Sequence, residues 1–195
     1  MQGLAVVAAV LGSLMVLAQC QTPCCFPTKF NVSLTDLATI NSDTIMVSTL
    51  EVDFAAEKQR ASTYTLDTQS GTSTFLATEV LDFSKGKMYV VEERNPSLCT
   101  EKFVSLKPQQ CVPAGAQYMG GTYLGPRLGG LQYDGWRYKI PGSDSVFTTA
   151  FTKLGCVPLV QGITSSEIQN GLFFFTTFGE GLASPIDIPE ACKHI

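Results

Sequence analysis

Residues 73–91 read STFLATEVLDFSKGKMYVV, and this stretch decides the fold class. It holds two β-prone runs, 73–83 and 87–91, which are separated by Ser84-Lys85-Gly86. A short polar link that contains glycine between two such runs predicts a β-hairpin. The apolar spacing of three and four residues that predicts a helix is almost absent from the whole chain. The stretch therefore predicts antiparallel β-structure.

The same pattern of short β-prone runs continues on both sides of this hairpin. Clear breaks fall at 126–130 (PRLGG), at Pro141-Gly142 and at 179–185. Closely spaced strands without helices between them predict an all-β domain, built as an antiparallel sandwich or barrel. The strands that we predict are 44–54, 59–66, 73–83, 87–91, 99–106, 117–124, 131–140, 146–154, 156–160 and 172–178.

The run Leu172-Phe173-Phe174-Phe175 is apolar on both faces of its predicted strand. We therefore expect this strand to lie between layers and not at an edge. Its rings have two interpretations, which are ordinary core and the wall of a cavity that wraps an apolar ligand. The sequence alone favours core.

The N-terminal segment predicts secretion. The first 28 residues carry no charged side chain, and Leu4 to Leu17 is an apolar run too short to span a bilayer. Ala18-Gln19-Cys20 places small residues at positions −3 and −1 of a cut after Cys20. We expect a signal peptide at 1–20, one domain at 21–195, and a secreted, extracellular protein.

The cysteines agree with this compartment. Of the 7 cysteines, the cut removes Cys20 and leaves an even set, which predicts three disulfides in a secreted chain. The six that remain are Cys24, Cys25, Cys99, Cys111, Cys156 and Cys192.

Asn31-Val32-Ser33 is the usable glycosylation sequon, because Pro96 blocks the one at Asn95. We expect Asn31 to be glycosylated, which would place the edge of the first strand in solvent.

Composition argues against two classes of function. The formal net charge is −4 and no cluster of Lys and Arg exceeds two residues, so nucleic acid is disfavoured as a partner. His194 is the only histidine and lies next to the C-terminus, where a Ser-His-Asp or Cys-His mechanism would have to depend on it. We expect no enzyme, with a glycosidase that uses carboxylates from distant strands as a remote alternative.

Calcium is the one metal that the sequence leaves open. The chain has no EF-hand loop, but Asp134-Gly135 and Ser143-Asp144 are expected in turns and are candidate sources of oxygen ligands. Turn chemistry explains both pairs at least as well. The residues of a metal site stay unknown at this stage.

Several short stretches follow one another along the chain in a characteristic serial order. They are Pro23-Cys24, Asp53-Phe54 with Gln59-Arg60, Lys85 to Tyr89 followed by Cys99, Trp136, Leu154 to Pro158, and Phe178 to Cys192. In this order they resemble the ependymin-related family. The departures are Ala183-Ser184-Pro185, which lacks the usual acidic residue before proline, and Cys25 and Cys111, which are additional to a four-cysteine core. These departures resemble an invertebrate-type member.

The resemblance implies two stacked antiparallel sheets that form a curved sandwich or half-barrel around an apolar groove. It also implies a secreted or lysosomal glycoprotein, often a homodimer, with links to calcium, lipid binding and cell–matrix contact. Because a bond between the adjacent Cys24 and Cys25 would be strained, we expect Cys99 and Cys192 each to pair at long range, and Cys111 to pair with Cys24 or Cys25. The side chains that we expect to line the groove are Trp136, Tyr138, Phe147, Phe151, Phe173 and Phe175.

The leading hypothesis is a secreted, non-enzymatic protein that binds a hydrophobic or lipid-like ligand in the groove. The alternative is a structural or adhesive protein of the extracellular or calcified matrix. A hydrolase that acts on glycans or lipids is the third hypothesis.

Overall fold

The computed structural model describes residues 23–194 except 41, 105–106, 127, 141–142 and 166–169. The expected signal peptide at 1–20 lies outside the described residues. Within them, the strands are β1 (Lys29–Asp36), β2 (Thr44–Asp53), β3 (Lys58–Asp67), β4 (Ser73–Asp82), β5 (Lys87–Glu92), β6 (Cys99–Phe103), β7 (Gln117–Leu124), β8 (Leu131–Lys139), β9 (Val146–Thr152), β10 (Pro158–Thr164) and β11 (Gly171–Glu180). Two short 3₁₀ helices, η2 (Leu37–Thr39) and η3 (Glu190–Cys192), accompany them.

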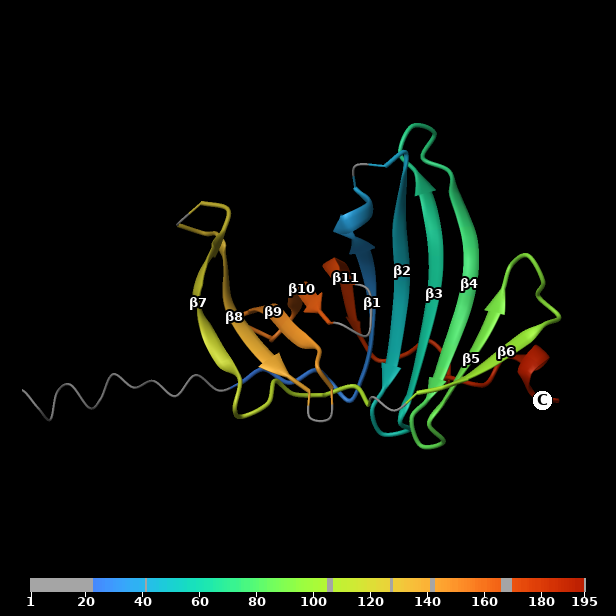
Figure 1. Ribbon diagram of the computed structural model, residues 1–195. Helices are drawn as coiled ribbons and strands as arrows, with labels where there is room; N and C mark the ends of the chain where they lie inside the picture. The colour runs from blue at the N-terminus through green and yellow to red at the C-terminus, as the bar shows by residue number, and fades with distance from the viewer. Residues whose placement is uncertain are drawn as a thin grey trace, which may run out of the picture.

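All the strands belong to one open antiparallel sheet with the order β6-β5-β4-β3-β2-β1-β11-β10-β9-β8-β7. The sheet bends, so that the wing β2–β5 faces the wing β7–β9 while β1 and β11 lie between them (Figure 1). The prediction of an antiparallel all-β fold is confirmed. The division into two stacked sheets is not confirmed, because hydrogen bonding continues from one wing to the other through β1 and β11.

The β4–β5 hairpin, predicted from residues 73–91, is present. Its register pairs Asp82 with Lys87, and the Asp82 carboxylate accepts hydrogen bonds from the Ser84 hydroxyl at 2.5 Å and from the Lys85 N–H at 3.2 Å. Gly86 closes the turn at a φ of 65°, which a residue without Cβ adopts at little cost. The turn thus satisfies a carboxylate that is only 2% exposed.

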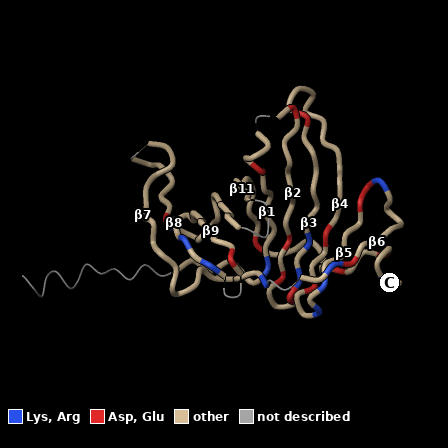
Figure 2. Tube along the Cα trace, in the orientation of Figure 1, with Lys and Arg blue, Asp and Glu red and all other residues tan. Residues whose placement is uncertain are grey.

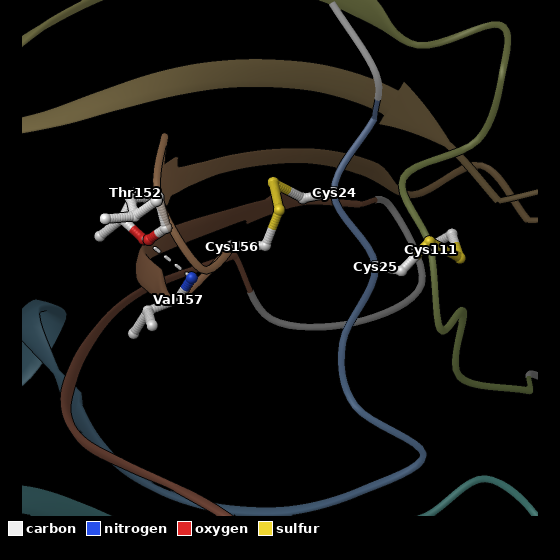
Figure 3. Close-up of a disulfide and its surroundings, with 7 residues drawn as sticks. Cys24, Cys25, Cys111, Thr152, Cys156 and Val157 are labelled. Atoms are coloured by element: carbon white, nitrogen blue, oxygen red, sulfur yellow. Dashed lines mark hydrogen bonds between the residues drawn. A yellow bond between two sulfur atoms is a disulfide. The ribbon is translucent and has the colours of Figure 1, made fainter.

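The turn between β9 and β10 corrects two predicted boundaries. Gly155 and Cys156 have φ values of 81° and 50°, in the left-handed region that a strand cannot use. The Thr152 hydroxyl accepts the Val157 N–H at 2.9 Å across this turn (Figure 3). The predicted strand 156–160 therefore begins later, at Pro158, and β9 ends at Thr152 instead of residue 154.

Strand β1 is not among the strands that the sequence predicts, and its place in the sheet also differs from expectation. β1 pairs with β2 on one side and with β11 on the other, so it lies inside the sheet and exposes no edge. The expectation of a solvent-exposed edge at Asn31 is therefore wrong. The side chain of Asn31 is half-buried, and its Nδ2 donates to the Gly181 carbonyl at 3.2 Å. Glycosylation at Asn31 stays a prediction.

Strand β11, which carries the phenylalanine run, lies between β1 and β10 and not at an edge, as predicted. The expectation that it lies between two layers is not met, because none of its residues is fully buried. One sheet holds the described strands, so each face of β11 is covered only in part.

Three disulfides fix the connections between distant parts of the chain. Cys24–Cys156 and Cys25–Cys111 hold the N-terminal segment against the β9–β10 turn and the segment before β7 (Figure 3). Cys111 thus pairs with Cys25, one of its two expected partners. Cys99–Cys192 joins edge strand β6 to η3, after the C-terminal segment has passed behind β2–β4 (Figure 1).

Candidate ligand cavity

A cavity of about 340 Å³ lies between the two wings of the sheet. Leu50 and Val52 of β2 contribute one wall, and Tyr138 of β8 and Phe147 of β9 contribute the opposite wall. Phe175 of β11 lies between them. The bend of the sheet therefore brings together side chains that are far apart in the sequence, and the lining is predominantly apolar.

Aromatic contacts fix the walls of the cavity. Phe26 stacks on Phe30 with ring centroids 5.0 Å apart, and Tyr138 stacks on Phe147 at 5.7 Å. Stacked rings of this kind contribute packing energy beyond their buried area. Pro108, from the segment that connects β6 to Cys111, covers part of the cavity. The walls are thus held by rings that pack on one another, which favours a preformed cavity.

The six side chains expected in the groove separate into two sets. Tyr138, Phe147 and Phe175 line the cavity. Trp136 and Phe151 are not among its lining residues and are buried, at 5% and 1% exposure, in a cluster with Cys24 and Val112. The sixth, Phe173, also lies outside the lining and is half-buried on β11.

Sequence reasoning missed the wall that the first wing provides. Phe30 on β1, Leu50 and Val52 on β2, and Leu81 on β4 line the cavity from that side. The alternation of apolar residues in β2 is visible in the sequence, and it shows that Leu50 and Val52 share a face. It does not show that this face points toward β8 and β9, because the bend of the sheet sets that direction.

A small polar cluster lies on the otherwise apolar wall formed by β8, β9 and β10. The Tyr138 hydroxyl lies 3.4 Å from Thr149 Oγ1, and Gln161 Nε2 donates to the same Oγ1 at 3.3 Å. Both Tyr138 and Gln161 line the cavity, while Thr149 is 1% exposed. Burial raises the pKa of Tyr138, and the hydrogen bonds with Thr149 and Gln161 lower it by less. The phenol is therefore neutral at physiological pH and remains a hydrogen-bond donor.

Lys107 is the one charged residue among the described residues that line the cavity. Its Nζ lies 2.7 Å from Glu57 Oε1, so its charge is already compensated. Elsewhere, residues of both signs are interspersed along the chain near the lower ends of β1–β6 (Figure 2). The cavity therefore offers an apolar surface and neutral hydrogen-bonding groups, and its one charge is paired.

The candidate calcium ligands are not gathered into one site. Asp134 lies within β8 and not in a turn, where its carboxylate accepts from the Tyr118 hydroxyl at 2.8 Å and pairs with Lys153 at 3.6 Å. Asp144 accepts from the Ser165 hydroxyl at 2.9 Å. In the part of the chain that is described, no group of three or more His, Cys, Asp and Glu side chains is placed to hold a metal ion. Calcium binding stays a prediction.

A family comparison now adds to this geometry. The model of the ependymin family matches residues 71–192, which is more than half of the 195 residues. The chain belongs to the ependymin family. The match includes the cavity wall with Tyr138, Phe147 and Phe175, and it ends at Cys192 of the third disulfide. The family is generally non-enzymatic, and membership together with the disulfides supports an extracellular protein.

Other comparisons are less informative for this ependymin-family chain. A crystal structure of an uncharacterized conserved protein from Thermus thermophilus is similar with a TM-score of 0.49 and 10% identity, over 80% of this chain and 82% of that one. No curated protein matches the sequence. Among the described residues, no helix has the length and apolar character needed to cross a membrane.

Proposed function

We propose that this ependymin-family protein is a secreted, non-enzymatic carrier that holds an apolar or amphipathic molecule in the cavity between the wings. The observation that carries the proposal is the cavity of about 340 Å³, whose lining is predominantly apolar. Ligand pockets in proteins are typically about 300–1,000 Å³ and combine apolar walls with a few placed polar groups. The cavity has both properties.

The source of affinity follows from the lining. An alkyl chain that leaves water for an apolar site gains about 0.8 kcal/mol for each buried methylene. A ligand that buries six to eight methylenes would gain roughly 5–6 kcal/mol, which offsets the lower end of the cost of association of about 4–15 kcal/mol. No charged contact is needed for binding of this kind.

A matrix protein that acts through self-association is the second candidate, and strand β7 supports it. This strand forms one edge of the sheet, all eight of its residues are exposed, and its sequence QYMGGTYL contains no charge. Edge strands without charges readily pair with further strands, so β7 favours a homodimer or a larger assembly. Calcium-dependent contact with the extracellular matrix would belong to this function.

Native mass spectrometry of the protein purified from its host separates the two candidates. A carrier retains a small apolar molecule that leaves at higher collision energy. A matrix protein shows oligomers that depend on calcium and carry no such molecule. Incubation with glycan and lipid substrates tests the remaining hydrolase hypothesis, and turnover would contradict a non-enzymatic carrier.

A further inference from the structure

We propose that the cavity selects ligands with an uncharged hydrogen-bonding head group, such as an alcohol, and rejects a carboxylate on the same alkyl chain. The recognising groups are Tyr138 and Gln161, which line the cavity, and Thr149 behind them contacts both side chains. This inference rests on the proposed carrier function, and it adds the chemical class of the ligand's polar end.

The sheet register explains why the three side chains meet. Thr149 of β9 is the direct cross-strand partner of Gln161 in β10. Tyr138 of β8 is paired with Phe147, two residues before Thr149 on the same face. Directly opposed and diagonal neighbours on one face of a sheet are within side-chain reach. Tyr138 and Gln161 therefore meet on the cavity wall, with Thr149 buried behind them.

The cluster has hydrogen-bonding capacity left for a ligand. The two contacts with Thr149 Oγ1, at 3.4 and 3.3 Å, lie at the long end of hydrogen-bond distances. A phenol and a primary amide together supply both donors and acceptors, so they match a hydroxyl, which is itself a donor and an acceptor. An alcohol placed here satisfies its own polar group while its chain contacts the apolar walls.

A carboxylate finds no equivalent partner. Taking an ionised group into an apolar cavity is costly unless a counter-charge or several strong donors receive it. The charged residue among the described lining residues is Lys107, and Glu57 lies 2.7 Å from its Nζ. A carboxylate at Lys107 would share an exposed ammonium whose charge Glu57 already balances, and one at the polar cluster would meet no cation. The cavity therefore favours the neutral head group.

The experiment compares head groups on one chain length. The fluorescent probe 1-N-phenylnaphthylamine is bound to the full disulfide-bonded protein at pH 7.4 and is displaced by 1-dodecanol or by dodecanoate. We expect 1-dodecanol to displace the probe at a concentration at least tenfold lower than dodecanoate. Equal or tighter binding of dodecanoate overturns the inference.

Variants then locate the selectivity. Y138F and Q161L each remove a polar group of the lining with little change of shape, and each should weaken 1-dodecanol by about three- to tenfold, the range expected for one neutral hydrogen bond. T149V removes the contact that positions both side chains and should weaken 1-dodecanol by a smaller factor. Dodecanoate should change by less than about twofold, because it does not use these groups. T148V is the matched control, since Thr148 is the exposed neighbour on the opposite face of β9 and lies outside the cavity lining.

The outcomes are distinguishable. Variants that weaken 1-dodecanol and dodecanoate equally overturn the role of the polar cluster. A protein that binds neither the probe nor any dodecyl compound contradicts the carrier function itself. Thermal melts of all variants identify any that fail to fold, and the three single substitutions provide independent tests of the same cluster.

Discussion

Replacing Phe151 and Phe175 separately by alanine should give opposite effects on stability and on ligand binding. Phe151 is 1% exposed, belongs to the cluster of Trp136, Cys24 and Val112, and contacts the Phe26 ring edge-on at 5.4 Å. F151A leaves a closed void, which costs about 3–5 kcal/mol. At about 2–4 °C per kcal/mol for a domain of this size, the melting temperature should fall by roughly 6–20 °C.

Phe175 is half-buried and lines the cavity, so its ring borders space that is already open. F175A removes a ring that is only partly buried, so it should lower the free energy of unfolding by about 1–2 kcal/mol. It also removes apolar surface from the ligand site. Thermal melts and probe displacement by 1-dodecanol measure the two effects. We expect ligand binding to weaken clearly in F175A.

F173A is the matched control for F175A. Phe173 lies two residues earlier on the same strand and is also half-buried, but it is not part of the cavity lining. F173A should therefore leave ligand binding intact. If F175A destabilises as much as F151A and binds ligand normally, the phenylalanines of β11 are ordinary core and the reasoning is refuted.

Three further predictions concern the disulfides, the acid stability and the tryptophan. Opening the bridge between Cys99 and Cys192, which are 93 residues apart, should cost about 2–5 kcal/mol in denaturant unfolding, and free thiols at these positions in non-reducing peptide maps would contradict the assignment. Burial raises the pKa values of Asp53 and Asp82, but their partners lower these values by more, so both pKa values lie below the usual 3.8. The partners are Lys29 and backbone N–H groups for Asp53, and Ser84 and Lys85 for Asp82. A carboxylate whose pKa is lowered in the folded state stabilises the fold above pH 3.8 and loses this contribution as the pH falls through its folded-state pKa. These two groups therefore predict a constant melting temperature from pH 7 to 5 and a decline below pH 4. If D53N and D82N melted like the wild type at pH 7, their contribution to stability would be contradicted. Trp136 is 5% exposed outside the cavity lining, so its emission should be blue-shifted and should change little with ligand, whereas a water-like maximum would contradict its burial.

Local sequence signals predicted most strands because their causes are local. The alternation in 73–83 and 87–91, with glycine between them, suffices for the β4–β5 hairpin. The β9–β10 turn was placed wrongly because a cysteine at positive φ follows Gly155, and cysteine is not a residue that marks such a turn.

Long-range pairing was not predictable from local patterns. The neighbours of β1 are β2 and β11, and Phe30 pairs with Glu180 across 150 positions of sequence. The sequence near Phe30 does not indicate that partner. For the same reason, three of the six candidate side chains line the cavity while the wall from Phe30, Leu50 and Val52 was missed. Alternation shows which residues share a face, and the bend of the whole sheet decides what that face encloses.

Native mass spectrometry of the protein secreted by its host, compared with the variant L50W, tests the central claim most directly. Leu50 lines the cavity from β2, so an indole at this position fills space that the ligand needs. The carrier account predicts a bound apolar molecule on the wild-type chain and its loss from a folded L50W. Wild-type protein that carries no such molecule and forms oligomers that depend on calcium would contradict it.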